Sequence, residues 1–206
     1  NNFKIVDYDY KSSGNISQSQ IVLKNHFKNE FIEKSVKKIL FEKIKLKIIY
    51  NKKKNNLLLL NGFYRINNLN YQKFEVNHNL NKKNQNYIID LDLAENFFLD
   101  VINFQSDYKK VSNIKVNYNL KNKKSTFKSV DFTQGKNIIS VKNLVVNKQK
   151  EIEKLASVKV QTFKKNKENN NFIINIGNKI SILGDRYDSS NILKLFSSDD
   201  KSNQFK

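Results

Sequence analysis

The 206-residue chain contains no cysteine, proline, methionine or tryptophan, and it contains only five glycines. Without cysteine there are no disulfide bonds and no thiolate metal ligands, so cysteine usage says nothing about the redox compartment. Average proline usage would give roughly ten prolines in this length, and the abundance of Lys, Asn and Ile indicates a low-GC coding bias. Because no initiator methionine is present, we expect the sequence to be an excised or processed piece of a longer chain.

Long apolar runs are also missing. The longest aliphatic run, residues 57–60, is far shorter than the roughly 18 residues that a membrane-spanning helix needs. The sequence has no secretory signal pattern either. We therefore expect any membrane anchor to lie outside this piece.

Arginine is scarce although the chain is strongly basic. The formal net charge is +19, but only two of the 38 basic residues are arginines, Arg65 and Arg186. Proteins that read nucleic-acid sequence favour arginine forks and aromatic platforms, and no RNP, zinc-finger or glycine-rich loop motif is present. The composition therefore argues against a nucleic-acid partner, and a basic structural component of a nucleoprotein assembly stays open as an alternative.

The first 43 residues differ in pattern from the rest, so residues 1–43 are treated as a separate unit. Residues 3–10 predict a strand, and the polar stretch 12–20 predicts a loop. From residue 25 to residue 43 apolar side chains recur at steps of three to five positions, which favours an amphipathic helix. These side chains are Phe27, Phe31, Val36, Ile39 and Leu40.

From residue 44 onward the apolar period becomes two, which is typical of strands with one buried face. The connections are short and rich in Asn, Lys, Ser and Gln, which suits antiparallel neighbours and is too short for parallel crossovers. Residues 44–206 are therefore predicted to form a mainly β domain, a long antiparallel meander. The predicted strands are 44–50, 57–66, 70–80, 86–93, 97–104, 113–120, 125–132, 137–146, 156–163, 172–177 and 179–184.

The apolar face of this meander needs a cover. Contiguous apolar patches above a few hundred Å² are rare on soluble monomers, and two short predicted helices are too little to cover eleven strands. Three arrangements stay open: a barrel, a sandwich, or a groove whose lining contacts an apolar ligand. The predicted fold class is a mainly β meander that is curled into a groove or open barrel.

Lysine runs fall at the predicted turns, including one at residues 121–124. Alternate turns of an up-and-down sheet share an edge, so four of the five runs are predicted to lie on one edge. Lysine at strand ends is an ordinary device for solubility, whereas the functional interpretation is a basic edge facing anionic head groups or nucleic acid. The lysines assigned to this basic edge are Lys52, Lys53, Lys54, Lys82, Lys83, Lys109, Lys110, Lys164 and Lys165.

No motif for catalysis or metal binding is present, and we expect neither enzyme activity nor a cofactor. His26 and His78 stand without a second His, Cys or carboxylate at ligand spacing, so both are interpreted as ordinary histidines. The acidic stretch 90–100 lacks the glycine of a calcium loop and alternates like a strand. Asp185 and Asp188 are interpreted as a turn residue and a helix N-cap rather than as an acid-base pair.

The stretch 180–196 is interpreted as a segment that closes off the end of the apolar face of the sheet. Its first residues predict a strand that ends at Gly184 and is followed by a turn at residues 185–186. Asp188 or Ser189 is then predicted to cap a short helix. The apolar residues of that helix are predicted to plug the end of the apolar face, and they are Ile192, Leu193 and Phe196.

The order of elements from about Tyr108 onward carries a family resemblance. The strands in NIKVNYNLKNKKSTFKSVDFTQGKNIISVKNLVV and in SVKVQTF are followed by FIINIGNKISILGDRYDSSNILKLF, where a strand runs into Gly-x-x-aromatic-Asp-Ser and a short Leu-rich helix. This order resembles the AsmA-like proteins of Gram-negative bacteria, particularly the long bridge-like members with a repeating β-groove. The resemblance implies a periplasmic, inner-membrane-anchored protein whose curled sheet carries phospholipid acyl chains toward the outer membrane. Family members are much longer and begin with a transmembrane helix, which this piece lacks.

We therefore predict a non-catalytic segment of a lipid-transfer bridge. Its expected partners are phospholipid acyl chains in the groove and a membrane that is reached through an anchor outside this piece. A surface or virion protein that self-associates through its sheet edges stays open as a further alternative. The residues predicted to line the groove are Ile114, Val116, Tyr118, Leu120, Ile139, Val141, Val158, Val160, Ile174, Ile176, Ile180 and Ile182.

Overall fold

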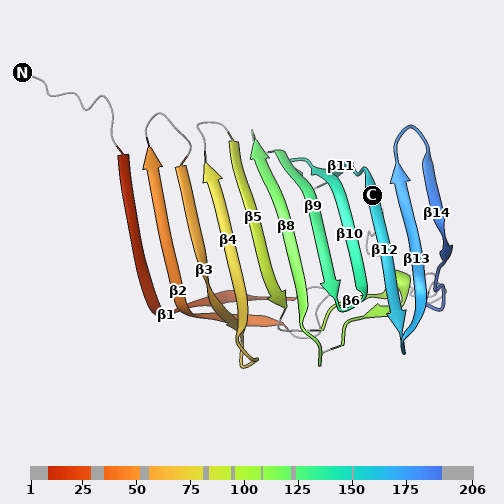
Figure 1. Cartoon of the computed structure of the whole chain (residues 1–206), viewed down its shortest axis with the longest axis horizontal. Helices are drawn as coiled ribbons and strands as arrows, with labels where there is room; N and C mark the ends of the chain where they lie inside the picture. Colours follow the sequence, from red (N-terminus) through yellow and green to blue (C-terminus); the bar gives the residue numbers. More distant parts are fainter. Residues whose placement is uncertain are drawn as a thin grey trace, which may run out of the picture.

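The computed structural model describes residues 9–28, 35–51, 56–80, 84–93, 96–107, 109–121, 124–149 and 151–191. In this part of the chain the backbone forms one large antiparallel sheet of twelve strands, which are paired in chain order except that β10 pairs with β12 and the short β11 pairs only with β10 (Figure 1). The strands of this sheet are β1 (Asp9–Phe27), β2 (Val36–Asn51), β3 (Asn56–Ile66), β4 (Gln72–Leu80), β5 (Asn84–Leu93), β8 (Ser112–Lys121), β9 (Lys124–Gln134), β10 (Asn137–Val146), β11 (Ile152–Lys154), β12 (Ser157–Lys164), β13 (Lys167–Ile176) and β14 (Ile180–Arg186). The predicted antiparallel meander is thus confirmed.

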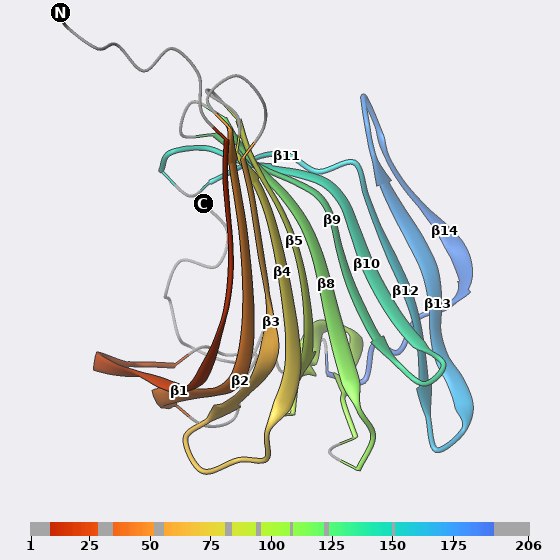
Figure 2. The same cartoon turned by 60° about the vertical axis from the view of Figure 1, so that its left-hand side comes forward.

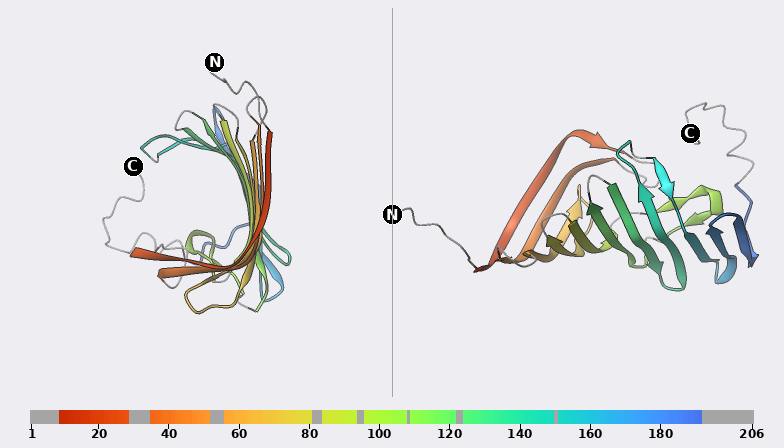
Figure 3. Two further views of the ribbon diagram at one scale, coloured as in Figure 1. Left: turned by 90° about the vertical axis from the view of Figure 1, so that its left-hand side faces the viewer. Right: turned by 90° about the horizontal axis from the view of Figure 1, so that it is seen from above.

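The sheet is curled but not closed. Strands β1 and β14 lie at its two opposite edges, and no pairing joins them among the described residues (Figure 1). Seen along its length, the sheet forms an arc with one concave side (Figure 3, left). Of the three arrangements that the sequence left open, the described strands adopt the open, curled one.

A short excursion between β5 and β8 crosses the concave side of the sheet. It contains β6 (Phe98–Leu99), the 3-10 helix η1 (Asp100–Ile102) and β7 (Phe104–Gln105), and β6 pairs with β7. Asn103 makes the turn between them with a φ of 48°, which Asn tolerates better than most residues. We call residues 96–107 the strap (green, at the concave side in Figure 3).

The strap and the sheet form the hydrophobic core together. Ile102 and Phe104 of the strap are buried against side chains from four successive strands, which the register brings into one row. That row consists of Phe132 of β9, Ile139 of β10, Val160 of β12 and Phe172 of β13. The core therefore lies on the concave side, between the strap and the C-terminal half of the sheet.

A bend in β1 and β2 curls the N-terminal edge of the sheet (Figure 2). Lys43 of β2 has a positive φ of 51°, and the register with β3 shifts between Glu42 and Lys45. Gly62 of β3 faces this bulge, and a Cβ there would stand 3.0 Å from the Cα of Ile44. A side chain at position 62 would therefore push the two strands apart at the bend.

The predicted amphipathic helix over 25–43 is wrong for the described residues. Residues 25–27 belong to β1 and residues 36–43 belong to β2, while 29–34 lie outside the described residues. The three buried residues of β2 are spaced by four positions, which satisfies a helical repeat as well as a strand; they are Val36, Leu40 and Ile44. The division between residues 43 and 44 falls inside β2, which continues through it.

Smaller elements also differ from the prediction. The predicted loop over 12–20 is part of β1, whose residues are polar because nearly all of them are exposed at the sheet edge. The predicted strand over 97–104 is broken into the strap by η1. Strand β14 does not end at Gly184 but continues through a register shift to Arg186, so the predicted turn at 185–186 lies inside the strand. The predicted C-terminal helix, with Ile192, Leu193 and Phe196, lies outside the described residues, as do residues 3–8 of the first predicted strand.

Candidate functional site

The concave side of the sheet is an apolar trough. Successive residues of a strand point to opposite faces, and the register places the inward residues of neighbouring strands opposite one another. One such row crosses nine strands without a polar side chain, and we call it the aliphatic row. It consists of Leu60, Val76, Ile89, Val116, Val130, Val141, Val158, Ile174 and Ile182.

All twelve residues that the sequence predicts to line a groove lie on this concave face, as their alternation and register require. Val160 and Ile139 are buried beneath the strap, where they belong to the core. At the C-terminal edge, by contrast, Ile180 and Ile182 are 70% and 68% exposed. The same face is therefore a sealed core under the strap and an open apolar surface beyond it.

The trough deepens into an open pocket of about 770 Å³ beside the strap. One wall is the strap, through Leu99 and Val101, and the floor is the sheet. Tyr187, just after β14, closes the C-terminal side. Pockets of this volume with mostly apolar walls are typical of sites for small apolar ligands.

Gln134 at the end of β9 fastens one end of the strap. Its side-chain amide donates to the carbonyl of Asp107 at 2.9 Å and accepts from the backbone N–H of Asp107 at 2.8 Å. The same amide nitrogen donates to the hydroxyl of Ser112 at 2.6 Å. Gln134 is buried, so these bonds replace its lost contacts with water and hold the strap in position.

The segment after β14 fastens the turn in the middle of the strap. We call residues 187–191 the hook. The hydroxyl of Tyr187 donates to the carbonyl of Val101 at 2.8 Å, and a carboxylate oxygen of Asp188 accepts from the amide of Asn103 at 2.9 Å. Hydrogen bonds from the side chain and backbone of Ser190 hold the pKa of Asp188 well below its usual range, despite the opposing effect of burial.

A fully buried polar pair lies beneath the hook. Asn170 of β13 and Thr162 of β12 are both 0% exposed. The amide of Asn170 donates to the carbonyl of Ile102 and to the hydroxyl of Thr162, both at 2.8 Å, and its oxygen accepts from the backbone N–H of Asp188 at 2.8 Å. One side chain thus links the strap, the sheet and the hook. This role cannot be predicted from the sequence, because an Asn in the run Glu-Asn-Asn-Asn is indistinguishable from its neighbours in a single sequence.

A second row on the concave face is aromatic. His78 of β4 stacks on Tyr87 of β5 with ring centroids 4.1 Å apart, Tyr87 lies 5.6 Å from Tyr118 of β8, and Tyr118 lies 4.9 Å from Phe127 of β9. We call these four residues the aromatic row. Burial lowers the pKa of His78, which favours the neutral imidazole. The alternation of Phe74, Val76 and His78 could have placed this histidine on the apolar face.

Of the nine lysines that the sequence assigns to a basic edge, four lie in the described part of the chain, and these four share one edge of the sheet. Lys109 and Lys110 precede β8, and Lys164 and Lys165 follow β12 in the turn to β13, so both pairs lie at the lower edge in Figure 1. Antiparallel pairing places the ends of β2 and β4 at the opposite, upper edge. The lysines that follow those strands lie outside the described residues, and they are Lys52, Lys53, Lys54, Lys82 and Lys83.

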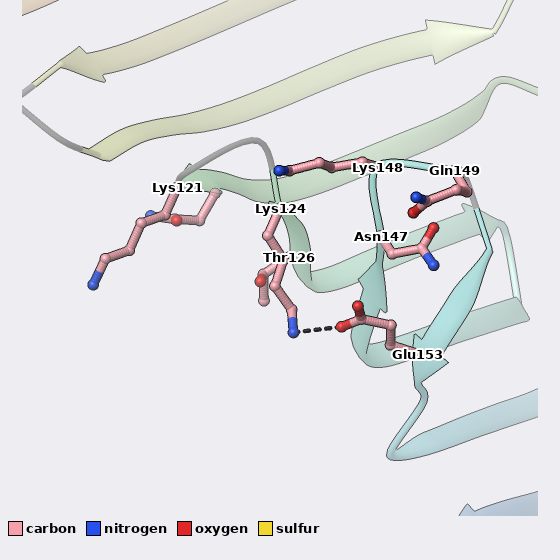
Figure 4. Close-up of a pocket in the computed structure, with 8 residues that line it drawn as sticks. Lys121, Lys124, Thr126, Asn147, Lys148, Gln149 and Glu153 are labelled. Carbon is pink, nitrogen blue, oxygen red and sulfur yellow. Dashed lines mark ion pairs between the residues drawn. The ribbon is translucent and has the colours of Figure 1, made fainter.

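A polar pocket of about 470 Å³ lies at the upper edge, between the β8–β9 and β10–β11 connections (Figure 4). Three lysines, Lys121, Lys124 and Lys148, line it. Lys124 forms an ion pair with Glu153 of β11. The ammonium groups point in different directions in Figure 4, so this pocket lacks the convergent donors of a built anion site.

The other candidate residues occupy ordinary structural positions. Asp90 and Asp92 of β5 accept hydrogen bonds from the amide of Asn113 at 2.7 and 3.1 Å, and Asp90 also pairs with Lys115 at 3.7 Å on the polar face. His26 is exposed on β1. Across the described ranges, no three His, Cys, Asp or Glu side chains gather closely enough to hold a metal ion.

The described residues contain no helix long and apolar enough to cross a membrane.

No protein-family model, curated protein or solved structure matches this chain. The resemblance to AsmA-like proteins therefore stays a prediction.

Proposed function

We propose that the trough binds the acyl chains of lipids and that the protein transfers lipid without catalysis. The observation that carries this proposal is the aliphatic row, which continues across nine strands while the strap covers only part of the concave face. A soluble protein rarely leaves so large an apolar surface without a partner. An acyl chain suits the trough because the row offers uniform aliphatic contact and no polar group.

The dimensions of the trough agree with such a ligand. Eight spacings of about 4.8 Å make the aliphatic row about 38 Å long, so several acyl chains lying along the strands fit side by side on it. Each methylene removed from water contributes about 0.8 kcal/mol. An acyl chain that passes from a membrane into the trough exchanges one apolar surrounding for another and so avoids the cost of entering water.

The resemblance to AsmA-like proteins supplies the cellular setting of the proposal. In that setting the protein acts in the periplasm, is anchored in the inner membrane by a segment outside this piece, and passes phospholipid toward the outer membrane. The open edges at β1 and β14 suit a longer apolar surface built from further strands.

The proposal is tested by native mass spectrometry with lipid extraction on the purified chain and on a double variant, Val116→Asp with Ile174→Asp. Two carboxylates in the aliphatic row should lower the lipid content about tenfold or more, because a bound chain would desolvate them. The matched control is Asn117→Asp with Ile173→Asp, which places the same charges on the same strands but on the opposite face. Equal lipid content in the wild type and a folded trough variant would contradict the proposal.

The same purified samples address the alternative of a basic nucleoprotein component. That alternative predicts a lipid-free protein carrying RNA or DNA, which is released as the salt concentration rises. The lipid proposal predicts near-stoichiometric lipid and an absorbance ratio at 260 and 280 nm that does not change with salt.

A further inference from the structure

The trough changes its chemical character along the strands, from the strap toward the upper edge. On β8 the residues facing the trough are, in order toward the upper edge, Ile114, Val116, Tyr118 and Leu120. Ile114 packs against the core beneath the strap, Val116 belongs to the aliphatic row, and Tyr118 belongs to the aromatic row. The trough is therefore purely apolar beside the strap and amphipathic two rows further on.

The aromatic row brings hydrogen-bonding groups to the trough. The hydroxyl of Tyr87 donates to Gln85 at 2.7 Å, and the hydroxyl of Tyr118 shares a hydrogen bond of 3.1 Å with Ser125. The Nε2 atom of His78 is buried and has no hydrogen-bond partner. A buried polar atom without a partner is costly, so a ligand oxygen beside the imidazole would satisfy a group that the protein alone leaves unpaired.

We infer that the aromatic row binds the junction between the head group and the chain of an amphipathic lipid, and that the chain runs along the strands toward the strap. This inference rests on the proposed lipid-binding function. The chemistry recognised is that of ester or carboxylate oxygens, which accept hydrogen bonds from the phenol of Tyr118 and the imidazole of His78. The hydroxyl of Tyr87 is not counted among these donors, because it already donates its proton to Gln85. Tyrosine, with an apolar ring and a polar tip, takes the corresponding position at the membrane interface.

The length of the trough along the strands fits this orientation. From Ile114 to Tyr118 is four residues, or about 13 Å at 3.3 Å per residue. The hydrocarbon layer of one bilayer leaflet is about 15 Å thick, half of the full core. A lipid chain whose head lies beyond Tyr118 therefore ends at the strap, and its head group faces the upper edge, where Lys121 and Lys124 end their strands.

The experiment is photo-crosslinking with two palmitic acids, one with a diazirine next to the carboxyl group and one with a diazirine near the methyl end. Each labelled chain is also supplied as an acyl chain of phosphatidylcholine, and the labelled peptides are identified by mass spectrometry. The orientation predicts that the carboxyl-side probe labels residues 84–88, 118–121 and 124–127 near the aromatic row, and that the methyl-side probe labels the strap. Labelling by the free acid, by the phospholipid, or by both supports the inference and identifies the source of the oxygens.

Two other outcomes overturn the inference, and they differ in what they say about the trough. Labelling that stays within the trough but is reversed or identical for the two probes refutes the orientation and leaves the lipid-binding function intact. Labelling that is absent from the concave face for every probe refutes both.

A double variant, His78→Phe with Tyr118→Phe, removes the two hydrogen-bond donors of the aromatic row while keeping an aromatic ring at each position. It should bind palmitic acid about tenfold more weakly, because two neutral hydrogen bonds are lost. Binding of the neutral apolar dye N-phenyl-1-naphthylamine should stay unchanged, which shows that the trough is intact. Tyr10→Phe on the exposed strand β1 is the control. Unchanged affinity for palmitic acid in the folded double variant would refute the role of the aromatic row.

Discussion

The side-chain amide of Asn170 donates a 2.8 Å hydrogen bond to the backbone carbonyl of Ile102, a residue 68 positions away in the chain. This bond ties the sheet to the strap at a point that water does not reach. It also explains how a short excursion with little regular structure stays fixed on the concave face. The fold thus depends on a buried polar contact as well as on apolar packing.

Replacing Asn170 by Ala should destabilise the protein by about 1–3 kcal/mol, because the change leaves buried groups of the strap, β12 and the hook without partners. Urea unfolding followed by circular dichroism measures the loss. Asn175→Ala, at an exposed position of the same strand, should have little effect. Equal stability of the two variants would show that the bond to Ile102 does not hold the strap.

Asp188 should make stability depend on acidic pH. Its folded pKa is lowered by hydrogen bonds, mainly from Ser190, so the folded state favours the charged carboxylate. The stabilisation is fully present above the unfolded pKa of about 3.9 and is lost as the pH falls below that value. Urea midpoints between pH 2.5 and 7 should therefore show a wild-type advantage over Asp188→Ala that shrinks on acidification. Asp185→Ala on β14 is the control, and a constant difference for Asp188→Ala across this range would contradict the explanation.

His78 should make the stability of the protein depend on pH in a second, higher range. Burial lowers its folded pKa, so the unfolded state binds more protons in the window below the unfolded value of about 6.5. The wild type should therefore lose stability as the pH falls below about 6.5. His78→Phe keeps a ring beside Tyr87 and should remove this loss, whereas His26→Phe on the exposed strand β1 should keep it. Identical pH profiles for the wild type and His78→Phe would argue against a desolvated imidazole in the aromatic row.

Gly184 should tolerate no side chain. Its φ is +157°, and a Cβ would stand 2.2 Å from the carbonyl oxygen of Asn171 and 2.5 Å from the Cα of Phe172. Gly184→Ala should therefore cost about 2–4 kcal/mol through backbone strain and overpacking. Gly177→Ala, where nothing lies within 4 Å of the added Cβ, should be nearly neutral. Thermal melts of the two variants compare them directly, and similar melting temperatures would disprove the predicted clash.

The strands of the C-terminal half could be predicted from the sequence because apolar and polar residues alternate along each of them. On β8 and β12, apolar and polar residues alternate without interruption, so the face of Val116 and Val158 follows from period alone. The antiparallel order follows from connections too short for anything else. The curvature of the sheet cannot be predicted from alternation and connection length, because it depends on bulges such as the one at Lys43.

The N-terminal strands and the strap were not predictable for two different physical reasons. In β2 the buried residues Val36, Leu40 and Ile44 repeat every four positions, a spacing shared by helices and strands. In the strap the outcome depends on partners distant in sequence: Asn103 meets Asp188, which is 85 positions away. The aromatic row could be predicted only in part. Alternation on β8 predicted that Tyr118 lines the groove, whereas His78 was interpreted from its residue type alone.

The continuity of the aliphatic row has a consequence for motion. A chain lying in the trough that shifts by one strand spacing exchanges contacts with one set of Val, Ile and Leu side chains for an equivalent set. For the acyl chain alone, sideways displacement therefore costs little free energy, whereas escape into water costs about 0.8 kcal/mol for every methylene exposed. Such a surface confines the chain strongly in one direction and weakly in another, so a lipid whose head group has left the aromatic row would diffuse in one dimension without a driving force from the protein.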